Sequence, residues 1–180
     1  VKWIEMSREQ IGRLSALIGE VRDLVHMEFN SELRSVLGED EPARIADQAL
    51  ACLRGGFANA GIELSVAVDK DLPSVRTDPE RAARCLSGLL AHARKFRVSG
   101  PVSLSVSRAG SAVACAVAYR GAKLSPAQAQ ASLDLFYPAQ KSHNQVLAAT
   151  GLGLGFAREI MRRVGGDVEF AVDEKGGARL

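Results

Sequence analysis

Residues 150–155 read Thr150-Gly151-Leu152-Gly153-Leu154-Gly155, and this stretch decides the fold of the chain. Its alternate glycines stand before an amphipathic run to Val164, where Gly165 and Gly166 end the helix that the run predicts. Backbone amides at such a helix start form an anion site. A dinucleotide-binding fold is a poor alternative, because the spacing is not G-x-G-x-x-G and the loop comes too late in the chain.

A second pattern begins at Asp78-Pro79-Glu80-Arg81 and predicts a helix that runs to Phe96. Asp78 is the expected N-cap, and Pro79 is the expected first helical residue. Positions four and seven apart lie on one face of a helix, so groups at that spacing can converge on one ligand. The positions with this spacing near the end of the helix are Gly88, His92 and Lys95.

Hydrophobic periodicity predicts the other elements. We expect a helix from Pro42 to Leu53 that ends at Arg54-Gly55-Gly56, then a half-buried strand over 62–68 and a turn over 69–73. We expect strands over 102–106 and 113–119, joined by a hairpin turn at Ala109-Gly110, and a last strand over 168–172 before Lys175-Gly176-Gly177. This order predicts an α+β fold, a two-layer α/β sandwich in which a mixed sheet carries helices on one face.

The N-terminal segment carries a seven-residue apolar repeat. Its members are Ile4, Ile11, Ile18 and Val25 at one position and Leu14 and Val21 at the other. Such a repeat is typical of a coiled coil or helical bundle, and an isolated helix of this length is marginal in water. We therefore expect residues 1–29 to form a dimerisation helix whose seam these residues make. A single amphipathic helix docked on its own domain is the alternative.

Composition limits the class of protein. With 180 residues, 47% of them hydrophobic, the chain can bury one core with a smaller appendage. No apolar stretch is long enough to span a bilayer, and no secretory signal opens the chain. The net charge of +2 does not indicate nucleic acid or an acidic membrane surface as a partner.

The cysteines indicate a reducing, cytoplasmic setting. Cys52, Cys85 and Cys115 are odd in number and widely spaced, which fits neither a disulfide framework nor a zinc site. We expect each to be a small buried apolar residue. The chain begins with a residue other than Met, inside a helical pattern, so we expect it to be a piece of a longer protein. Other segments of that protein can attach it to a membrane.

The helix from Asp78 and the glycine loop at 150–155 together resemble the histidine-kinase-type ATPases, the family that also includes gyrase and a heat-shock chaperone. The resemblance covers the whole chain. It implies the Bergerat-type ATPase fold over residues 30–180. Residues 1–29 would then be the remnant of the second helix of a histidine kinase dimerisation domain.

In this family, the helix after D-P-x-R-L carries two asparagines four apart and a basic residue three further on. At the asparagine positions this chain has Gly88, where the family has its catalytic acid-base residue, and His92, where the family binds magnesium. An imidazole is a poor substitute because magnesium prefers hard oxygen ligands. We expect His92 to be a partly exposed surface histidine. Lys95, placed to meet phosphate, and Phe96, placed near the base, keep the family's chemistry.

A second family motif, D-x-G-x-G, ends a strand, and its aspartate accepts a hydrogen bond from the adenine amino group. The matching residues here are Tyr119-Arg120-Gly121-Ala122-Lys123. Tyr119 replaces the aspartate, Lys123 replaces the second glycine, and Gly121 alone is kept. The phenol of Tyr119 is large enough to occupy the adenine position itself.

The rest of the resemblance concerns the lid and the phosphate loop. Leu135-Phe136-Tyr137-Pro138 resembles the family's short aromatic motif, with Ala139 in place of a second phenylalanine, and residues 141–149 would be the lid over ATP. By position, the residues expected to contact nucleotide or phosphate are Lys95, Phe96, Gly121, Thr150, Gly151, Leu152 and Gly153.

The substitutions weaken the expected ATP site. A hydrogen bond to a charged group contributes about 1.5–3 kcal/mol, so losing the adenine acceptor and the metal ligand costs on the order of 3–6 kcal/mol. That is roughly a hundred- to ten-thousand-fold in dissociation constant. Family kinases also carry a phosphoacceptor histidine followed by an acidic residue, whereas neutral residues follow His26, His92 and His143. We expect no catalytic residue and no bound metal in this chain.

These observations predict a pseudokinase of two-component signalling. It would bind ATP weakly or not at all, need no cofactor, and act as a homodimer through contacts with a response regulator or a partner kinase. No nucleic-acid or membrane contact is expected. The alternatives are an active histidine kinase with a drifted site that still uses ATP and magnesium, a module for another ligand held by His92, Lys95 and Tyr119, and an anti-sigma-factor-like role.

Overall fold

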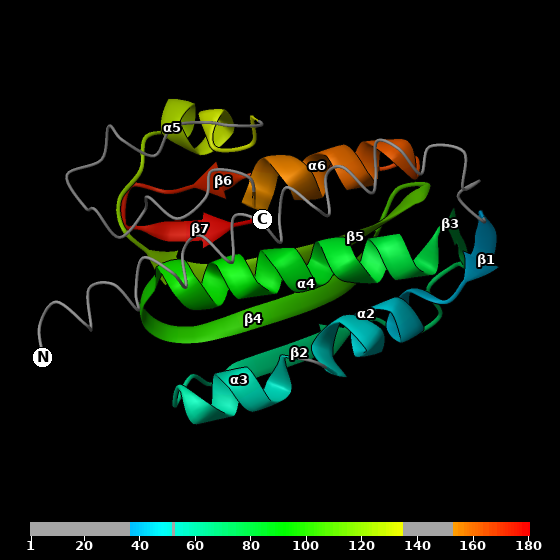
Figure 1. Ribbon diagram of the computed structural model, residues 1–180, viewed down its shortest axis with the longest axis horizontal. Coiled ribbons are helices and arrows are strands. Elements are labelled where there is room, and N and C mark those ends of the chain that lie inside the picture. The colour runs from blue at the N-terminus through cyan, green and yellow to red at the C-terminus, as the bar shows by residue number, and fades with distance from the viewer. Residues whose placement is uncertain (1–36, 52, 135–152) are drawn as a thin grey trace, which may run out of the picture.

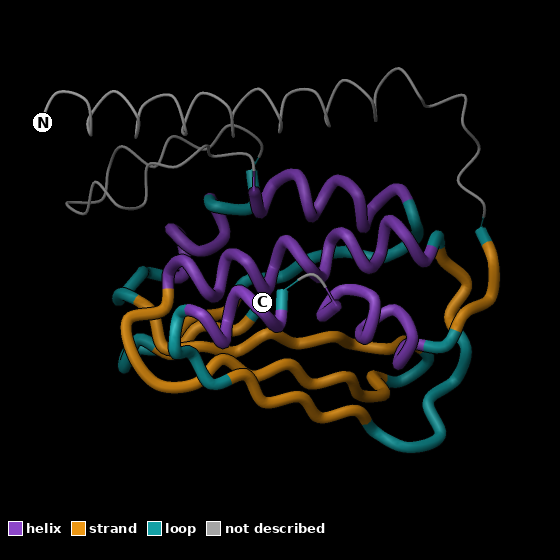
Figure 2. Tube along the Cα trace, turned by 60° about the horizontal axis from the view of Figure 1, so that its bottom comes forward, coloured by secondary structure: helices purple, strands orange, loops and turns teal. Residues whose placement is uncertain are grey.

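The computed structural model describes residues 37–51, 53–134 and 153–180. These residues form two layers, with helices on one side and a sheet on the other (Figures 1 and 2). The predicted dimerisation helix with its seam, Cys52, the aromatic motif with the lid, and residues 150–152 of the glycine loop lie outside the described residues. Within the described part of the chain, no helix is long and apolar enough to cross a bilayer.

The elements follow one another as β1 (Gly38–Asp40), α2 (Pro42–Ala51), α3 (Arg54–Asn59), β2 (Leu64–Val68), β3 (Val75–Thr77), α4 (Pro79–Phe96), β4 (Arg97–Ala109), β5 (Ala112–Gly121), α5 (Pro126–Ala131), α6 (Gly153–Arg163), β6 (Ala171–Val172) and β7 (Gly177–Arg179). The main sheet has the strand order β2-β4-β5-β7-β6, and β1 pairs with β3 in a small second sheet. β2 is parallel to β4, whereas the other neighbours in the main sheet are antiparallel. The predicted mixed sheet is therefore confirmed.

Alternation along β4 decides which face of the sheet the helices cover. Val102, Leu104 and Val106 are almost fully buried, whereas the serines between them are half-buried. In the antiparallel register Ser103 pairs with Ala118 and Ser105 with Ala116, so small residues line the other face. Because successive side chains of a strand point to opposite faces, this pattern places the large apolar residues under the helices.

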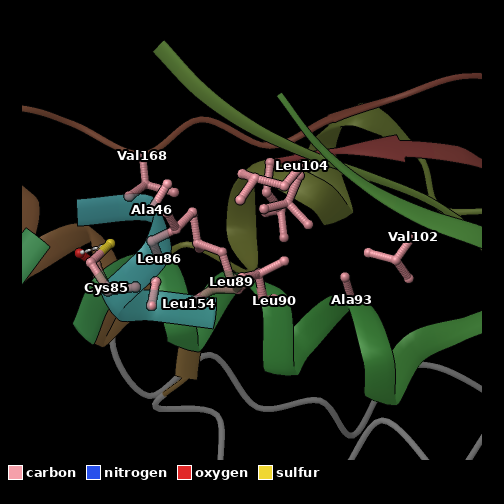
Figure 3. Close-up of a cluster of buried hydrophobic side chains, with 14 of the residues drawn as sticks. Ala46, Cys85, Leu86, Leu89, Leu90, Ala93, Val102, Leu104, Leu154 and Val168 are labelled. Atoms are coloured by element: carbon pink, nitrogen blue, oxygen red, sulfur yellow. Dashed lines mark hydrogen bonds between the residues drawn. The ribbon is translucent and has the colours of Figure 1, made fainter. Parts of the chain in front are cut away.

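Helix α4 lies at the centre of the helical layer, where it packs against both α2 and α6 (Figure 1). Its buried face meets the sheet and the neighbouring helices through Leu86, Leu89, Leu90 and Ala93 (Figure 3). Leu90 is fully buried, and burial of such a side chain contributes about 1.5–3 kcal/mol. The packing of α4 therefore determines where its side chains lie relative to the sheet.

The predicted start of α4 is confirmed. Asp78 has an extended backbone, its carboxylate accepts a hydrogen bond from the amide of Arg81 at 3.1 Å, and Pro79 begins the helix. The Arg81 guanidinium also lies 3.4 Å from the same carboxylate. A side-chain cap and a proline at the first position are the features that start a helix.

The predicted end at Arg54-Gly55-Gly56 is wrong, because these residues begin α3. Two contacts hold this short helix against its low propensity. Phe57 is 1% exposed in the core, and Arg94 donates a hydrogen bond to the carbonyl of Gly56 at 3.2 Å. A side-chain carbon at Gly56 would lie 2.7 Å from Arg94 Nη1, so a larger residue there would displace the end of the Arg94 side chain.

The predicted elements need further corrections, which concern strands and one helix. The strand expected over 62–68 is β2, which lies at the edge of the sheet. Its apolar side chains were expected to be covered, but Val66 and Val68 are 38% and 39% exposed. The last strand is only Ala171–Val172, and the glycine-containing turn after it leads into the unpredicted β7, which pairs with β5. The unpredicted helix α5 begins with a capping box between Ser125 and Gln128.

The cysteines follow the prediction in part. Cys85 is 3% exposed, and its thiol donates to the carbonyl of Ala157 at 3.4 Å. Burial raises the pKa of the Cys85 thiol to about 12. Cys115 is half-buried, and burial raises its thiol pKa too. Both thiols are therefore protonated at neutral pH.

The cap of α4 gives a first test. Asp78→Ala is expected to lower the free energy of unfolding by about 0.5–2 kcal/mol, since it leaves the Arg81 amide without its acceptor. Urea denaturation of both proteins measures the change. Asp47→Ala, at an exposed position of α2, is the matched control and should change stability by less than about 0.5 kcal/mol. Equal effects of the two substitutions would contradict the role of the cap.

Candidate functional site

The described site lies where the end of α4 faces the end of β5. α4 supplies His92 and β5 supplies Tyr119, and a hydrogen bond of 3.1 Å joins the imidazole Nε2 to the phenol oxygen. Tyr119 is only 7% exposed, so its side chain lies between the sheet and the helical layer. The two residues stand at the predicted metal and adenine positions, and the structure brings them into direct contact.

Aromatic rings surround His92. The ring of Phe96, one helical turn further along α4, lies with its centroid 4.3 Å from that of His92. Tyr119 and Phe170 meet the imidazole edge-on, with centroid distances of 6.1 and 6.0 Å. His92 is half-buried, so the expected partial exposure is observed, but the side chain is not a free surface histidine, because the sheet and the segment before β6 both present aromatic rings to it.

Gly121 lies directly beside the tyrosine. A side-chain carbon at Gly121 would come within 2.9 Å of Tyr119 Cε2 and 3.4 Å of the Phe96 carbonyl oxygen. Gly176, with a φ of +84°, brings its backbone equally close, since a side-chain carbon there would lie 2.9 Å from the Gly121 carbonyl oxygen. The Gly121 amide donates to the Gly176 carbonyl at 2.9 Å. Gly121 therefore sits in a tight backbone crossing that also accommodates a phenol ring.

Burial keeps both members of the pair neutral. Burial, followed by the nearby charge of Lys95, lowers the pKa of His92 to about 3. Burial raises the pKa of the Tyr119 phenol above its usual range. At neutral pH the site thus contains an uncharged imidazole and an uncharged phenol, and each partner satisfies a polar atom of the other.

The other predicted residues lie around this pair. Lys95 is exposed, with its Nζ 5.4 Å from the centroid of the Phe96 ring. Gly88 and Lys123 are exposed, and a side-chain carbon at Gly88 would meet nothing within 4 Å. Gly153 is the first residue of α6. The described structure thus gathers Phe96, Gly121, His92 and Tyr119, and leaves Gly88 and Lys123 facing outward.

The residues present do not fit magnesium and adenine in the expected way. His92 Nε2 is hydrogen-bonded to Tyr119, so this atom is already engaged. By the resemblance, Tyr119 stands where the family has a carboxylate that accepts from the adenine amino group. A free hard-oxygen ligand, which magnesium requires, is missing from this pair.

Sequence reasoning missed two features of the site. It left the direction of the Tyr119 side chain open, and it did not include Phe170. The direction of the Tyr119 side chain could have been inferred from the resemblance. The positions of His92 and Tyr119 face one ligand in the family, so the two side chains should face each other here. Phe170 alternates with Val168 and Val172, which indicated only that its side chain is buried.

Comparisons with known proteins agree with this fold. A family model described as histidine kinase-, DNA gyrase B-, and HSP90-like ATPase matches residues 77–180. The sensor histidine kinase ZraS of Escherichia coli O157:H7 is 23% identical over 181 residues, which cover 98% of this chain and 36% of that protein. The chain thus spans about a third of the length of this curated relative.

Solved structures of histidine kinases are similar over nearly the whole chain. Full-length ShkA in complex with AMPPNP has a TM-score of 0.73 and 23% identity, with 99% of this chain and 37% of that chain covered. The Acinetobacter baumannii histidine kinase AdeS has a TM-score of 0.70 and 18% identity, with 98% and 80% covered. ThkA in complex with the response regulator protein TrrA has a TM-score of 0.71 and 18% identity, with 99% and 49% covered. At these identities the likeness establishes the fold, so the predicted Bergerat-type fold is confirmed.

His92 links stability to pH. An ordinary histidine has a pKa of about 6.5, so below that pH the unfolded chain takes up a proton that folded His92, with a pKa of about 3, does not. The stability that neutral His92 contributes is complete above about pH 6.5 and is lost as the pH falls toward 3, by at most about 1.4 kcal/mol per pH unit.

Melting temperatures between about pH 7.5 and about pH 5 test this dependence. The wild-type protein should lose more stability over this interval than His92→Gln, which cannot titrate. The other two histidines are present in both proteins, so the difference isolates His92. Parallel pH profiles would contradict a neutral imidazole with a lowered pKa.

Proposed function

Because the chain belongs to the histidine kinase-, DNA gyrase B- and HSP90-like ATPase family, we propose that it is the ATPase-type domain of a two-component sensor kinase homologue that no longer binds ATP effectively. In this proposal the domain is a pseudokinase, and it signals through protein contacts rather than through phosphoryl transfer. The similarity to the sensor histidine kinases ZraS and AdeS over nearly the whole chain supports the two-component setting.

The observation that carries the proposal is the contact between His92 and Tyr119. Through the resemblance to the family, one of these positions should offer an acceptor to adenine and the other an oxygen to magnesium. Here the two side chains satisfy each other at 3.1 Å, and Tyr119 is 7% exposed. ATP would have to separate this pair before the base could enter.

Separating the pair adds to the cost of the lost contacts. Breaking a neutral hydrogen bond costs about 0.5–1.5 kcal/mol, and moving a buried aromatic side chain into water costs about 1.5–3 kcal/mol. These terms come on top of the roughly 3–6 kcal/mol that the two substitutions remove from nucleotide binding. Together they favour a nucleotide-free domain at ordinary ATP concentrations.

The protein contacts of the proposal concern two partners. The solved complex of ThkA with the response regulator protein TrrA supports a response regulator, or the partner kinase of one, as the binding partner. The heptad repeat of residues 1–29 supports homodimerisation through a helix with the seam Ile4, Ile11, Leu14, Ile18, Val21 and Val25. A phosphoacceptor histidine, if the longer protein has one, would lie outside this chain.

Calorimetric titration tests the loss of ATP binding. ATP and ADP, each with and without magnesium, should give no saturable heat with the wild-type chain at about 100 µM. Saturable, magnesium-dependent binding would overturn the proposal and favour the active kinase with a drifted site. In that case, phosphorylation of the full-length protein would be the next measurement.

A variant provides the positive control. Tyr119→Asp combined with His92→Asn restores the family's acceptor and metal ligand, and should improve ADP binding at least about tenfold over wild type, which corresponds to about 1.4 kcal/mol. Glu63→Asp with Ser65→Asn, at exposed positions on and beside β2, is the matched control and should leave binding unchanged. If the site variant folds but gains no affinity, the pair is not what prevents nucleotide binding.

A further inference from the structure

Tyr119 makes contacts that a bound small molecule would make. Its ring is buried beneath the last turns of α4, meets the imidazole of His92 edge-on, and hydrogen-bonds through its hydroxyl to His92 Nε2. Phe96 and Phe170 complete the aromatic surroundings of that imidazole. A flat ring in an apolar setting with one polar anchor is how ligand sites commonly hold an aromatic compound.

Gly121 makes room for this ring. Its φ is not in the left-handed region, so its backbone conformation does not require glycine. The space available at this position does require glycine. A side-chain carbon at Gly121 would lie 2.9 Å from Tyr119 Cε2, closer than such carbons normally approach another atom. Gly88 differs, since a side-chain carbon there would meet nothing within 4 Å.

We propose that Tyr119 is an intramolecular ligand: its phenol permanently occupies a site beside His92, whose ring packs against Phe96 and Phe170, and the lack of a side chain at Gly121 makes room for the phenol. The inference rests on the proposed function, because it assigns the occupant of the same site. It also assigns the class of compound that the site takes, a neutral phenol rather than a nucleotide.

Charge supports this choice of ligand. Burial lowers the pKa of His92 to about 3 and raises the pKa of Tyr119, so both partners of the hydrogen bond are neutral at physiological pH. An anionic group beside a neutral imidazole would lose hydration without gaining an ionic partner in His92. A phenol needs neither a cation nor a metal.

An ordinary core tyrosine would make a simpler account. Truncation of an ordinary core residue also leaves a cavity, because its neighbours relax only partly, and such a cavity can take any apolar compound of the right size. An internal ligand instead occupies a site with a polar anchor, so the empty site should prefer an analogue that carries the hydroxyl. The two accounts therefore differ in what happens after Tyr119 is truncated.

Truncation and rescue provide the first experiment. Tyr119→Ala should lower the melting temperature by on the order of 10 °C, and 4-methylphenol, the free tyrosine side chain, should raise it again by about 3–5 °C at ten times its dissociation constant. Toluene, which lacks the hydroxyl, should rescue less because it cannot bond to His92. The wild-type protein should not respond to either compound.

Phe57→Ala is the matched control, since Phe57 is 1% exposed in the same core but is not one of the residues that surround His92. Its melting temperature should show no preference for 4-methylphenol over toluene. If Tyr119→Ala folds and 4-methylphenol gives no greater stabilisation than toluene, the proposal is wrong.

A double-mutant cycle tests the role of Gly121. Gly121→Ala should lower the melting temperature of the wild-type protein, but much less in the Tyr119→Ala background, where the ring that it opposes is gone. Gly88→Ala should have the same small effect in both backgrounds. Additive losses from Gly121→Ala and Tyr119→Ala would overturn the assignment of Gly121.

The experiments remain decisive if Tyr119→Ala does not fold. Tyr119→Leu, which fills more of the space without an aromatic edge, then replaces it in the cycle with the same expectations. Failure of this inference is also distinct from failure of the proposed function: rescue and coupling concern the occupant of the site, whereas ATP titration of the wild-type chain concerns the loss of nucleotide binding.

Discussion

The packing of α4 across the sheet is the constraint on which the rest of the structure depends. The helix lies between α2 and α6, and its leucines fill the space above β4 and β5. This arrangement fixes the height and rotation of its last turns, and so brings His92 to the end of β5. In an ATP-binding relative the same geometry would place side chains next to a nucleotide. Here it places the imidazole next to Tyr119.

The His92–Tyr119 pair behaves as one unit rather than as two independent losses. Either residue alone would leave a buried polar atom without a partner, and such an atom is costly in a setting of low polarity. Together they form a neutral hydrogen bond within an aromatic cluster, so each satisfies a polar atom of the other. In the proposed pseudokinase, this pairing would let the domain stay well packed without the family's polar groups.

Much of the fold followed from the sequence, because long periodic segments define their own buried faces. The start of α4, the β4–β5 hairpin and the end of α6 are where periodicity, Asp78 and the glycines placed them. The short elements did not follow, since α3 and β7 depend on distant partners such as Arg94 and β5. The site residues on α4 and β5 were also identified from the sequence, but their mutual contact was not. The face of the sheet to which a strand side chain points is known only once the register is known.

The most direct test of the account is nuclear magnetic resonance of the His92 ring nitrogens and the Tyr119 hydroxyl, recorded with and without ATP and magnesium. The account predicts a neutral imidazole down to about pH 5, a hydroxyl proton protected from solvent, and no change when nucleotide is added. An imidazole that titrates near its ordinary pKa, or a pair that separates when ATP binds, would contradict a site that is filled by its own side chain.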